Sequence, residues 1–417
     1  MRQITTETRI EATPETTGVL ETVLREGARR MLQAALEAEI EEHIARYKDL
    51  VDESGKRAVV RNGYQPERKI LTGAGAIPVK RPRVDDRLLD AAGKERFTSR
   101  ILPKFMRRAA NIDTLIPVLY LKGISTDDFP TALEAILGPQ AKGLSATTVV
   151  RLKDIWTEEH AEWSKRDLSE KRYVYVWADG VYSNARLEDE RACLLVIMGA
   201  DSLGNKELIA VSDGFRESAQ SWKEILLDLK SRGLQIDPAL AVCDGAMGFQ
   251  AAAAEVWPST RIQRCWFHKS GNILDKLPSS IQAKAKGMIH DMYLAPTRED
   301  ALKAYELFIA SFGAKYPKAV ECLTKDKDDL FAFYDFPAAH WIHLRTTNPI
   351  ESTFATVRLR HRKTKGNGTR KATLAMVYKL CREAEKGWRK LDGFKLISLV
   401  VAGKKFVNGE QVDDAVA

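Results

Sequence analysis

The stretch YVYVWADGVY, residues 173–182, decides the fold of this chain. Its β-branched and aromatic residues are typical of a buried strand, and the run ends in Asp179 and Gly180, where glycine permits a tight turn or the close approach of a ligand. A second stretch, ALAVCDGA at residues 239–246, repeats this pattern and ends in Asp244 and a glycine. If the two strands lie side by side, both carboxylates reach one edge of a sheet, where such oxygen ligands suit Mg²⁺ or Mn²⁺. Each Asp-Gly pair alone is also typical of an ordinary surface turn.

The elements around these two stretches predict an α/β fold with a mixed sheet. Patterns typical of strands cover residues 191–200, 206–212 and 260–266, and patterns typical of helices cover residues 218–233 and 248–257. Three strands, a helix, a strand, a helix and a last strand is the order of an RNase H-like core, in which the first and fourth strands are neighbours. This order predicts that Asp179 and Asp244 meet.

The core is expected in two parts, because a long helical stretch interrupts it. Residues 268–343 have helical patterns and are too long for a loop inside a compact domain, which predicts an all-helical insertion. The core then comprises residues 169–267 before the insertion and residues 344–405 after it.

A third candidate carboxylate, Glu351, lies near the start of the last part of the core. Asn348 is a good N-cap, Pro349 suits the first helical position, and Glu351 then falls at N3, where it could simply close a capping box. Arg358 follows two helical turns later on the same face. A carboxylate that leads into a basic helix face would also place a metal ion and a DNA phosphate together. From these residues alone, both interpretations of Glu351 remain open.

Two segments are rich in Lys and Arg, in a chain whose formal net charge is +8. Residues 358–371 contain seven basic and no acidic residues, and residues 80–108 contain ten basic against four acidic residues. Such segments suit contacts with phosphates, although the second could be a solvated surface. The candidate DNA-binding residues are Arg358, Arg360, Arg362, Lys363, Lys365, Arg370, Lys371, Lys80, Arg81 and Arg83.

The N-terminal part predicts three regions before the core. Residues 1–55 hold an amphipathic helix that either covers a core or forms a dimer contact. Residues 56–110 are a basic module of small strands and loops. Residues 111–168 contain helical pieces, with Ser125 and Ser145 as candidate N-caps, that outline either a DNA-binding helix-turn-helix or a helical packing unit without DNA contact. At the other end of the chain, residues 406–417 predict a disordered acidic tail.

Composition places the chain in the cytoplasm. It is 44% hydrophobic and 29% charged, as in soluble globular proteins. Five scattered cysteines, an odd number, favour a reducing compartment. No apolar run approaches the ~18 residues of a membrane span, so no membrane association is expected.

The motif Cys265-x-x-His268 follows the last predicted strand. Zinc would need two further ligands, and no tidy second pair exists in the sequence, so no zinc is expected. The two residues are more plausibly packed and hydrogen-bonded beside the site. Trp266, between them, is either a core aromatic or a residue on which a base stacks.

Six short motifs follow one another along residues 60–395: RNGYQP at 61–66, LYLKGIST at 119–126, WADGVY at 177–182, VCDGAMGF at 242–249, QRCWFHK at 263–269 and TTNPIEST at 346–353. Together they resemble the Mutator-type (IS256-family) transposases of bacterial insertion sequences, which are related to eukaryotic Mutator-like elements. The resemblance places the family's acidic positions on Asp179, Asp244 and Glu351. It places the Cys/Asp-x-x-His motif on Cys265 and His268 and the basic position after the Glu on Arg358.

The resemblance implies a DDE transposase with an RNase H-like core and two Mg²⁺ (or Mn²⁺) ions held by the three carboxylates. The expected reaction is strand cleavage at terminal inverted repeats followed by strand transfer, by copy-out through a circular intermediate. The expected partners are the terminal inverted repeats, target DNA and further copies of the chain in a dimer or larger assembly, at the bacterial nucleoid. Three rival classes remain: a DNA-binding transposase derivative without catalysis, an RNase H-like nuclease without strand transfer, and a glycosidase with paired carboxylates. The last would leave the basic segments unexplained.

Overall fold

The structure is a computed structural model that describes residues 18–91, 94–124, 128–137, 146–183, 192–214, 216–245, 247–364 and 369–412. The chain divides into two compact units, Met1–Thr148 and Val149–Ala417.

The first unit is built around one long helix, α1 (Val19–Arg46), which packs against two of four short strands. The strands are β1 (Val60–Tyr64), β2 (Arg68–Thr72), β3 (Gly75–Val79) and β4 (Pro82–Asp85). They form two antiparallel pairs, β1 with β4 and β2 with β3. A small core joins Leu36 of α1 to Ile70 and Ile77 of the strands. Near the start of α1, in contrast, apolar side chains such as Val19 and Val23 are exposed.

The helices expected between residues 111 and 157 are present but are divided between the two units. They are α3 (Ala110–Leu121) and α4 (Phe129–Leu137), which follow the short α2 (Leu88–Ala91), and α5 (Ala146–Trp163). The unit boundary at Thr148 falls in the first turn of α5, so most of α5 belongs to the second unit. There His160 contacts the Val211 carbonyl at 2.9 Å, and the ring centroids of Trp163 and Tyr378 lie 5.0 Å apart. The expected caps Ser125 and Ser145 lie outside the described residues.

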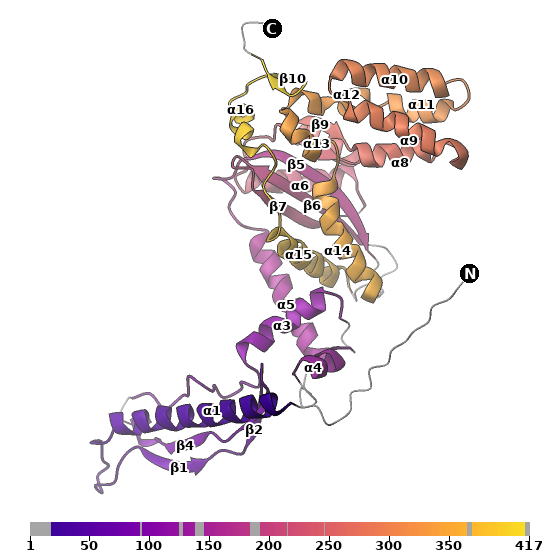
Figure 1. Ribbon diagram of the computed structural model, residues 1–417. Coiled ribbons are helices and arrows are strands. Elements are labelled where there is room, and N and C mark those ends of the chain that lie inside the picture. Colours follow the sequence, from indigo (N-terminus) through magenta and orange to yellow (C-terminus); the bar gives the residue numbers. More distant parts are fainter. Residues whose placement is uncertain are drawn as a thin grey trace, which may run out of the picture. The chain divides into compact units, whose positions relative to one another are not determined.

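The second unit contains a five-stranded mixed sheet in the order β7-β6-β5-β8-β9 (Figure 1). Its strands are β5 (Tyr173–Ser183), β6 (Ala192–Asp201), β7 (Lys206–Gly214), β8 (Leu240–Cys243) and β9 (Arg261–Arg264). The first three form an antiparallel meander, whereas β8 and β9 run parallel to β5. The prediction that the first and fourth strands are neighbours is confirmed, because β5 pairs directly with β8.

Different helices cover the two faces of this sheet. α6 (Ala219–Ser231) and α7 (Met247–Val256) pack on one face, where Trp222 and Phe249 join Val176 and Ala178 in the main core. Side chains alternate along a strand, so Trp177 lies on the opposite face, where it is fully buried. Helices α14 (Asn348–Thr364), α15 (Arg370–Glu385) and α16 (Ile397–Val401) also contact the strands.

Every described element between β9 and α14 is helical, and α8 to α12 lie together beside the β9 side of the sheet (Figure 1). These elements are α8 (Trp266–Leu274), α9 (Ser279–Leu294), α10 (Arg298–Phe312), α11 (Pro317–Thr324), α12 (Lys327–Leu330), η1 (Ala332–Asp335), η2 (Ala338–His340) and α13 (Trp341–Leu344). A buried ion cluster ties them to the sheet: Asp326 accepts from Lys269 at 2.6 Å and from Arg264 at 3.3 Å. The predicted last strand is shorter than expected, because the chain turns into α8 at Trp266.

The predicted disordered tail is wrong for residues 406–412. They form a hairpin of β10 (Phe406–Val407) and β11 (Glu410–Gln411), beyond η3 (Phe394–Leu396). The hairpin docks on the helical segment: the Gly409 amide donates to the Tyr334 carbonyl at 3.1 Å, and the Arg298 amide donates to the Asn408 side chain at 2.8 Å. These backbone contacts fix a segment whose polar composition alone favours disorder.

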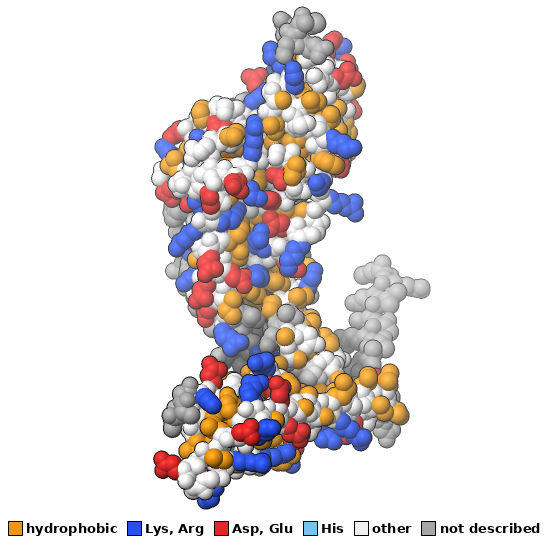
Figure 2. Space-filling view, turned by 90° about the vertical axis from the view of Figure 1, so that its left-hand side faces the viewer, with side chains coloured by type: hydrophobic (Ala, Val, Ile, Leu, Met, Phe, Trp, Pro, Cys, Tyr) orange, Lys and Arg blue, Asp and Glu red, His pale blue; other side chains and the backbone are white. Residues whose placement is uncertain are grey.

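Lys, Arg, Asp and Glu side chains intermingle over the surface seen in Figure 2. Within the described part of the chain, no helix combines the length and the apolar character that crossing a lipid bilayer would require.

Candidate active site at the sheet edge

Three neighbouring parallel strands bring functional side chains into one row. Ala178, Cys243 and Arg264 are register partners on β5, β8 and β9. The next residue on each strand is a candidate site residue: Asp179, Asp244 and Cys265. Asp179 lies within β5, which stays paired with β6 as far as Ser183, so its Asp-Gly pair is not a surface turn. The predicted meeting of the two strands at this edge is confirmed by the register.

Asp179 is the best-buried of the predicted carboxylates, with 6% of its surface exposed. Its Oδ1 accepts the amide of Gly180 at 2.8 Å. Burial, followed by the charge of Asp244, raises the pKa of Asp179 to about 7, although the charge of His268 acts in the opposite direction. A carboxylate in this environment is ionised at lower free-energy cost when a cation binds beside it.

The glycine after Asp244 leaves room for the Arg264 side chain. A Cβ on Gly245 would lie 2.0 Å from Cζ of Arg264, so the guanidinium lies against the backbone just beyond Asp244. Arg264 is itself buried and is held by Asp326. The glycine of an Asp-Gly motif allows another group to approach the backbone closely. At Gly245 this group is the side chain of Arg264 from the neighbouring strand β9.

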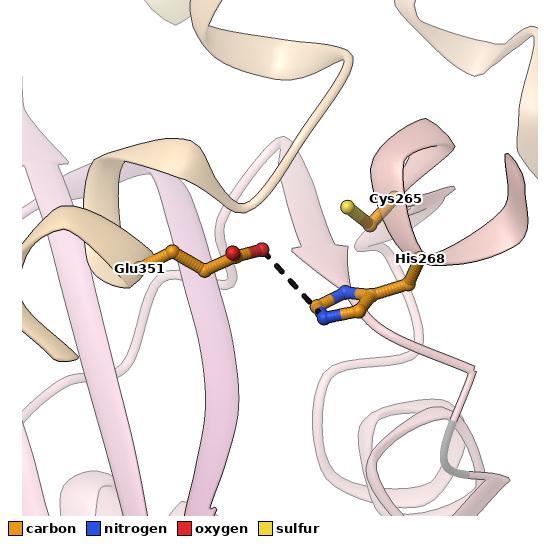
Figure 3. Close-up of side chains that lie close together, drawn as sticks. All are labelled: Cys265, His268 and Glu351. Atoms are coloured by element: carbon orange, nitrogen blue, oxygen red, sulfur yellow. Dashed lines mark ion pairs between the residues drawn. The ribbon is translucent and has the colours of Figure 1, made fainter. Parts of the chain in front are cut away.

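Glu351 comes to the site from the first turn of α14 and points toward His268 (Figure 3). Its Oε1 accepts the Thr347 hydroxyl at 2.7 Å and lies 3.6 Å from Nε2 of His268. Asn348 was expected to cap the helix, but α14 begins at Asn348 and the Glu351 amide donates to the Thr347 carbonyl at 3.0 Å, so Glu351 lies one position beyond the N3 that a capping box requires. Thr347 therefore precedes the helix, and the carboxylate of Glu351 faces the site.

Cys265 and His268 form a polar pair that contacts the base of α14. The sulfur accepts the Thr347 amide and hydroxyl, each at 3.3 Å. Burial raises the pKa of the Cys265 thiol, but hydrogen bonds from His268 and Thr347 outweigh burial and lower it below its ordinary value. Hydrogen bonding to Cys265 raises the pKa of His268 to about 9, and the charges of Asp179 and Glu351 add to this effect. The raised pKa of His268 favours the protonated ring, whose Nε2 lies 3.6 Å from Oε1 of Glu351.

The donor atoms fit a metal ion in two ways. Asp179, Asp244 and Glu351 offer only oxygens, the ligands that Mg²⁺ and Mn²⁺ prefer, and a cation would offset the burial and the charge of Asp244 that raise the pKa of Asp179. In addition, Cys265, His268 and Glu351 each have a ligand atom within 4.8 Å of those of the other two. Glu351 thus adds a third possible zinc ligand to Cys265 and His268, which the sequence alone did not indicate. The expectation that the protein holds no zinc stays a prediction, to be checked by the metal content of the purified protein.

The other predicted site residues differ in how far they are exposed to solvent. Trp266 is a core aromatic: it is fully buried and donates to the Leu330 carbonyl at 2.8 Å. Among the basic candidates, Arg358, Lys371, Lys80 and Arg83 are exposed and Arg81 is half-buried. Arg360 is buried, which fits poorly with a phosphate contact, and Arg370 pairs with Asp213 at 2.8 Å. The side chains of Arg362, Lys363 and Lys365 lie outside the described part.

Sequence reasoning missed two residues at the site. Thr347 touches both Glu351 and Cys265, and its place in the motif TTNPIEST was the only available signal. Glu217, just before α6, adds a carboxylate, and burial together with the charge of Asp244 raises its pKa. Nothing in the local sequence distinguishes Glu217 from an ordinary glutamate before a helix.

Two further histidines, His340 and His343, make hydrogen bonds within the fold. His340 contacts the Tyr175 hydroxyl at 2.8 Å and the Gly393 carbonyl at 3.0 Å. The Asp392 amide donates to Nε2 of His343 at 3.0 Å, which requires a neutral ring there. Burial, with the charge of Lys206 adding, lowers the pKa of His343 to about 4.

This pKa predicts a loss of stability in mild acid. The folded-state pKa of His343 lies below its ordinary value of 6.5, so the unfolded chain takes up the proton first, and stability is lost as the pH falls from about 6.5 to 4. Between pH 7 and 5 we expect His343 to account for about 2 kcal/mol of this loss. Urea unfolding at both pH values should show a smaller loss for His343→Gln than for the wild type. His290→Gln on α9 is the control, and equal losses in all three proteins would contradict the prediction.

Acidic side chains at the edge of a mixed sheet, next to a helix with exposed basic side chains, suit the chemistry of phosphodiesters. The family model "Transposase, Mutator family" matches residues 1–391. The chain is 51% identical over 299 residues to the transposase for insertion sequence element IS6120 of Mycolicibacterium smegmatis, covering 72% of this chain and 92% of that protein. It is 48% identical over 278 residues to the transposase for insertion sequence element IST2 of Acidithiobacillus ferrooxidans, covering 67% and 94%.

This chain belongs to the Mutator family of transposases. Among solved structures, the Drosophila P element transposase strand transfer complex matches with a TM-score of 0.28 and 11% identity, over 76% of this chain and 88% of that chain. A similarity this low has no bearing on the fold.

Proposed function

We propose that this chain is a DDE transposase of an insertion sequence, which cuts DNA at terminal inverted repeats and joins the freed ends to another strand. Asp179, Asp244 and Glu351 are the proposed catalytic carboxylates, on an RNase H-like core with a helical insertion. The observation that carries the proposal is the row at the sheet edge, where the register aligns Asp179 with Asp244 and α14 delivers Glu351 beside His268. By family resemblance, transposition is copy-out through a circular intermediate.

Mg²⁺, or Mn²⁺, bound by these carboxylates would supply the positive charge that activates water and stabilises the leaving oxygen. The residues of the chain have separate roles in this proposal. Asp179, inside a paired strand, provides a rigid oxygen donor, and Asp244 continues the same row. The Thr347 hydroxyl and the His268 cation hold the orientation of the Glu351 carboxylate. Cys265 lies close to His268 and raises the pKa of the imidazole, which favours the charged ring.

Phosphate contacts are assigned to exposed basic side chains. Arg358 lies two turns after Glu351 on α14 and is exposed. Its guanidinium lies 6.0 Å from the ring centroid of Phe354 on the same helix. Lys80 and Arg83 of the first unit would add contacts that carry no sequence information. The exposed apolar side chains near the start of α1 support assembly into a dimer or larger complex. The proposed location of this complex is the bacterial nucleoid.

Two rivals make different predictions on the same substrate. A DNA-binding derivative without catalysis would bind duplex DNA but leave it uncut. An RNase H-like nuclease would cut DNA at the ends of the element but would give no joined product. The presence in this chain of all three acidic residues expected from the resemblance favours an active enzyme over the first rival, and the family favours strand transfer over the second.

The test is cleavage and strand transfer on DNA that carries the element's own ends, in Mg²⁺, with the wild type and Glu351→Gln. Glutamine can still accept the Thr347 hydroxyl, so the start of α14 is preserved, but glutamine is a poor metal ligand. Loss of a ligand from such a site costs several kcal/mol of transition-state stabilisation, so we expect cleavage to fall by roughly 10³-fold. Affinity for DNA should be unchanged.

The control is Glu321→Gln, which changes an exposed glutamate on α11 and should leave cleavage at the wild-type rate. Full activity of Glu351→Gln would remove Glu351 from the site. Cleavage by the wild type without any joined product would favour the nuclease.

A further inference from the structure

Glu217 places its carboxylate directly over the glycine that follows Asp179. A Cβ added to Gly180 would lie 2.3 Å from Oε1 and 2.5 Å from Cδ of Glu217. The space beside Gly180 is therefore occupied by a carboxylate from the start of α6. A side chain at position 180 would have to displace this carboxylate, because β5 continues through the position without a turn.

The backbone around Glu217 is fixed from both sides. On one side, a Cβ on Gly248 of α7 would lie 2.2 Å from the Glu217 carbonyl oxygen and 2.9 Å from the Ala219 nitrogen. On the other, Arg216 has a φ of 62°, a left-handed conformation that is uncommon for residues other than glycine. Strained backbone of this kind persists only where the surrounding structure imposes it, and it is concentrated at functional sites.

The electrostatic environment of Glu217 is that of the site. Burial and then the charge of Asp244 raise the pKa of Glu217, whereas a hydrogen bond from Tyr182 and the charge of His268 lower it. Glu217 in turn contributes to the raised pKa of Asp179. The same two site residues, Asp244 and His268, thus act on Glu217 and on Asp179.

We propose that Glu217 is a fourth carboxylate of the metal-binding site and contributes an oxygen ligand to a divalent cation, either directly or through a water molecule. This inference rests on the proposed function, because it extends the carboxylate set of the same site. It also explains the glycines of two motifs: Gly180 in WADGVY leaves room for the Glu217 side chain, and Gly248 in VCDGAMGF leaves room for its backbone. Together they leave room for the Glu217 side chain beside the residue that follows Asp179, within reach of the charge of Asp244.

The test measures metal binding without DNA. Mn²⁺ affinity, followed by electron paramagnetic resonance, is compared among the wild type, Glu217→Gln and Glu224→Gln, and the thermal midpoint Tm is measured with and without Mn²⁺. Glu224 is an exposed glutamate later on α6, bonded to Gln220, and serves as the matched control. We expect Glu217→Gln to bind Mn²⁺ at least about tenfold more weakly, since loss of a ligand or of its supporting contact has effects of that order. Its metal-free Tm should not fall, and Glu224→Gln should match the wild type.

Two results would overturn the inference: Mn²⁺ affinity of Glu217→Gln within twofold of the wild type, or a fall in its metal-free Tm, which would make the carboxylate a purely structural group. Asp179→Asn, measured in parallel, separates this inference from the proposed function. If Asp179→Asn loses Mn²⁺ binding while Glu217→Gln keeps it, only the fourth carboxylate fails. If Asp179→Asn also binds Mn²⁺ and cuts DNA normally, the proposed function fails as well.

Discussion

An Asp179→Asn variant is expected to cut no DNA and yet to unfold at a higher temperature than the wild type when no divalent cation is present. Loss of cleavage follows from removal of a charged ligand at the centre of the proposed site, with an effect of roughly 10³-fold or more. The gain in stability follows from the environment of Asp179, where burial and the charge of Asp244 disfavour the ionised form. Asparagine has a similar shape and carries no charge.

The sign of the pH dependence follows from the same environment. The folded-state pKa of Asp179, about 7, lies above its ordinary value of 3.8, so the folded protein holds the proton longer than the unfolded chain does. Stability therefore falls as the pH rises from about 4 to 7, by at most about 4 kcal/mol from this group. Asp179→Asn should lack this part of the decline.

Unfolding in urea with a chelator present, at pH 5 and pH 8, measures the effect. Asp291→Asn, which changes an exposed aspartate on α9, is the control and should follow the wild type. If the stability of the wild type and of Asp179→Asn changed equally with pH, ionisation of the buried Asp179 would not destabilise the folded protein. Asp179 would then provide no electrostatic reason for a cation to bind there.

Replacement of Gly248 by alanine is expected to destabilise the second unit by about 3 kcal/mol and to abolish cleavage. In most helices this change stabilises by up to about 1 kcal/mol, because glycine is a poor helix former. Here the new Cβ would lie 2.2 Å from the Glu217 carbonyl oxygen and 2.8 Å from the Ser218 carbonyl carbon. Both are backbone atoms that cannot rotate away, so α7 and the start of α6 must separate, which is the costly form of overpacking.

The matched control is Gly287→Ala on α9. Gly287 also lies within a helix, but nothing is within 4 Å of the position where its Cβ would be placed. This variant should gain up to about 1 kcal/mol in the free energy of unfolding and should cut DNA normally. Denaturation by urea gives both values. Equal stability of the two alanine variants would show that α7 and the start of α6 can move apart at little cost in free energy.

The parts of the site that sequence could predict depend on short-range patterns. Asp179 and Asp244 each end a strand-forming apolar run, and neighbouring parallel strands must bring such ends together. Glu351 could be placed on a helix start from Asn348 and Pro349, but the exact boundary could not, because the competing cap Thr347 is selected by its contact with Cys265, which lies far away in the sequence.

Residues that depend on tertiary packing escaped prediction. Glu217 belongs to the site only because Gly180 and Gly248, from two other elements, leave space for it. The tail was predicted to be disordered because its composition is polar, whereas residues 406–412 form a hairpin in which Gly409 bonds to Tyr334. The assignment of DNA contacts to Arg358 and the other basic residues stays a prediction.

The hairpin of β10 and β11 has a consequence for chains that are still being synthesised. Asp179 and Asp244 leave the ribosome well before Glu351, and the hairpin that clamps Tyr334 and Ala338, shortly before α14, is translated later still. On the proposed assignment, a nascent chain or a product of premature termination carries two of the catalytic carboxylates but lacks the clamp behind the third.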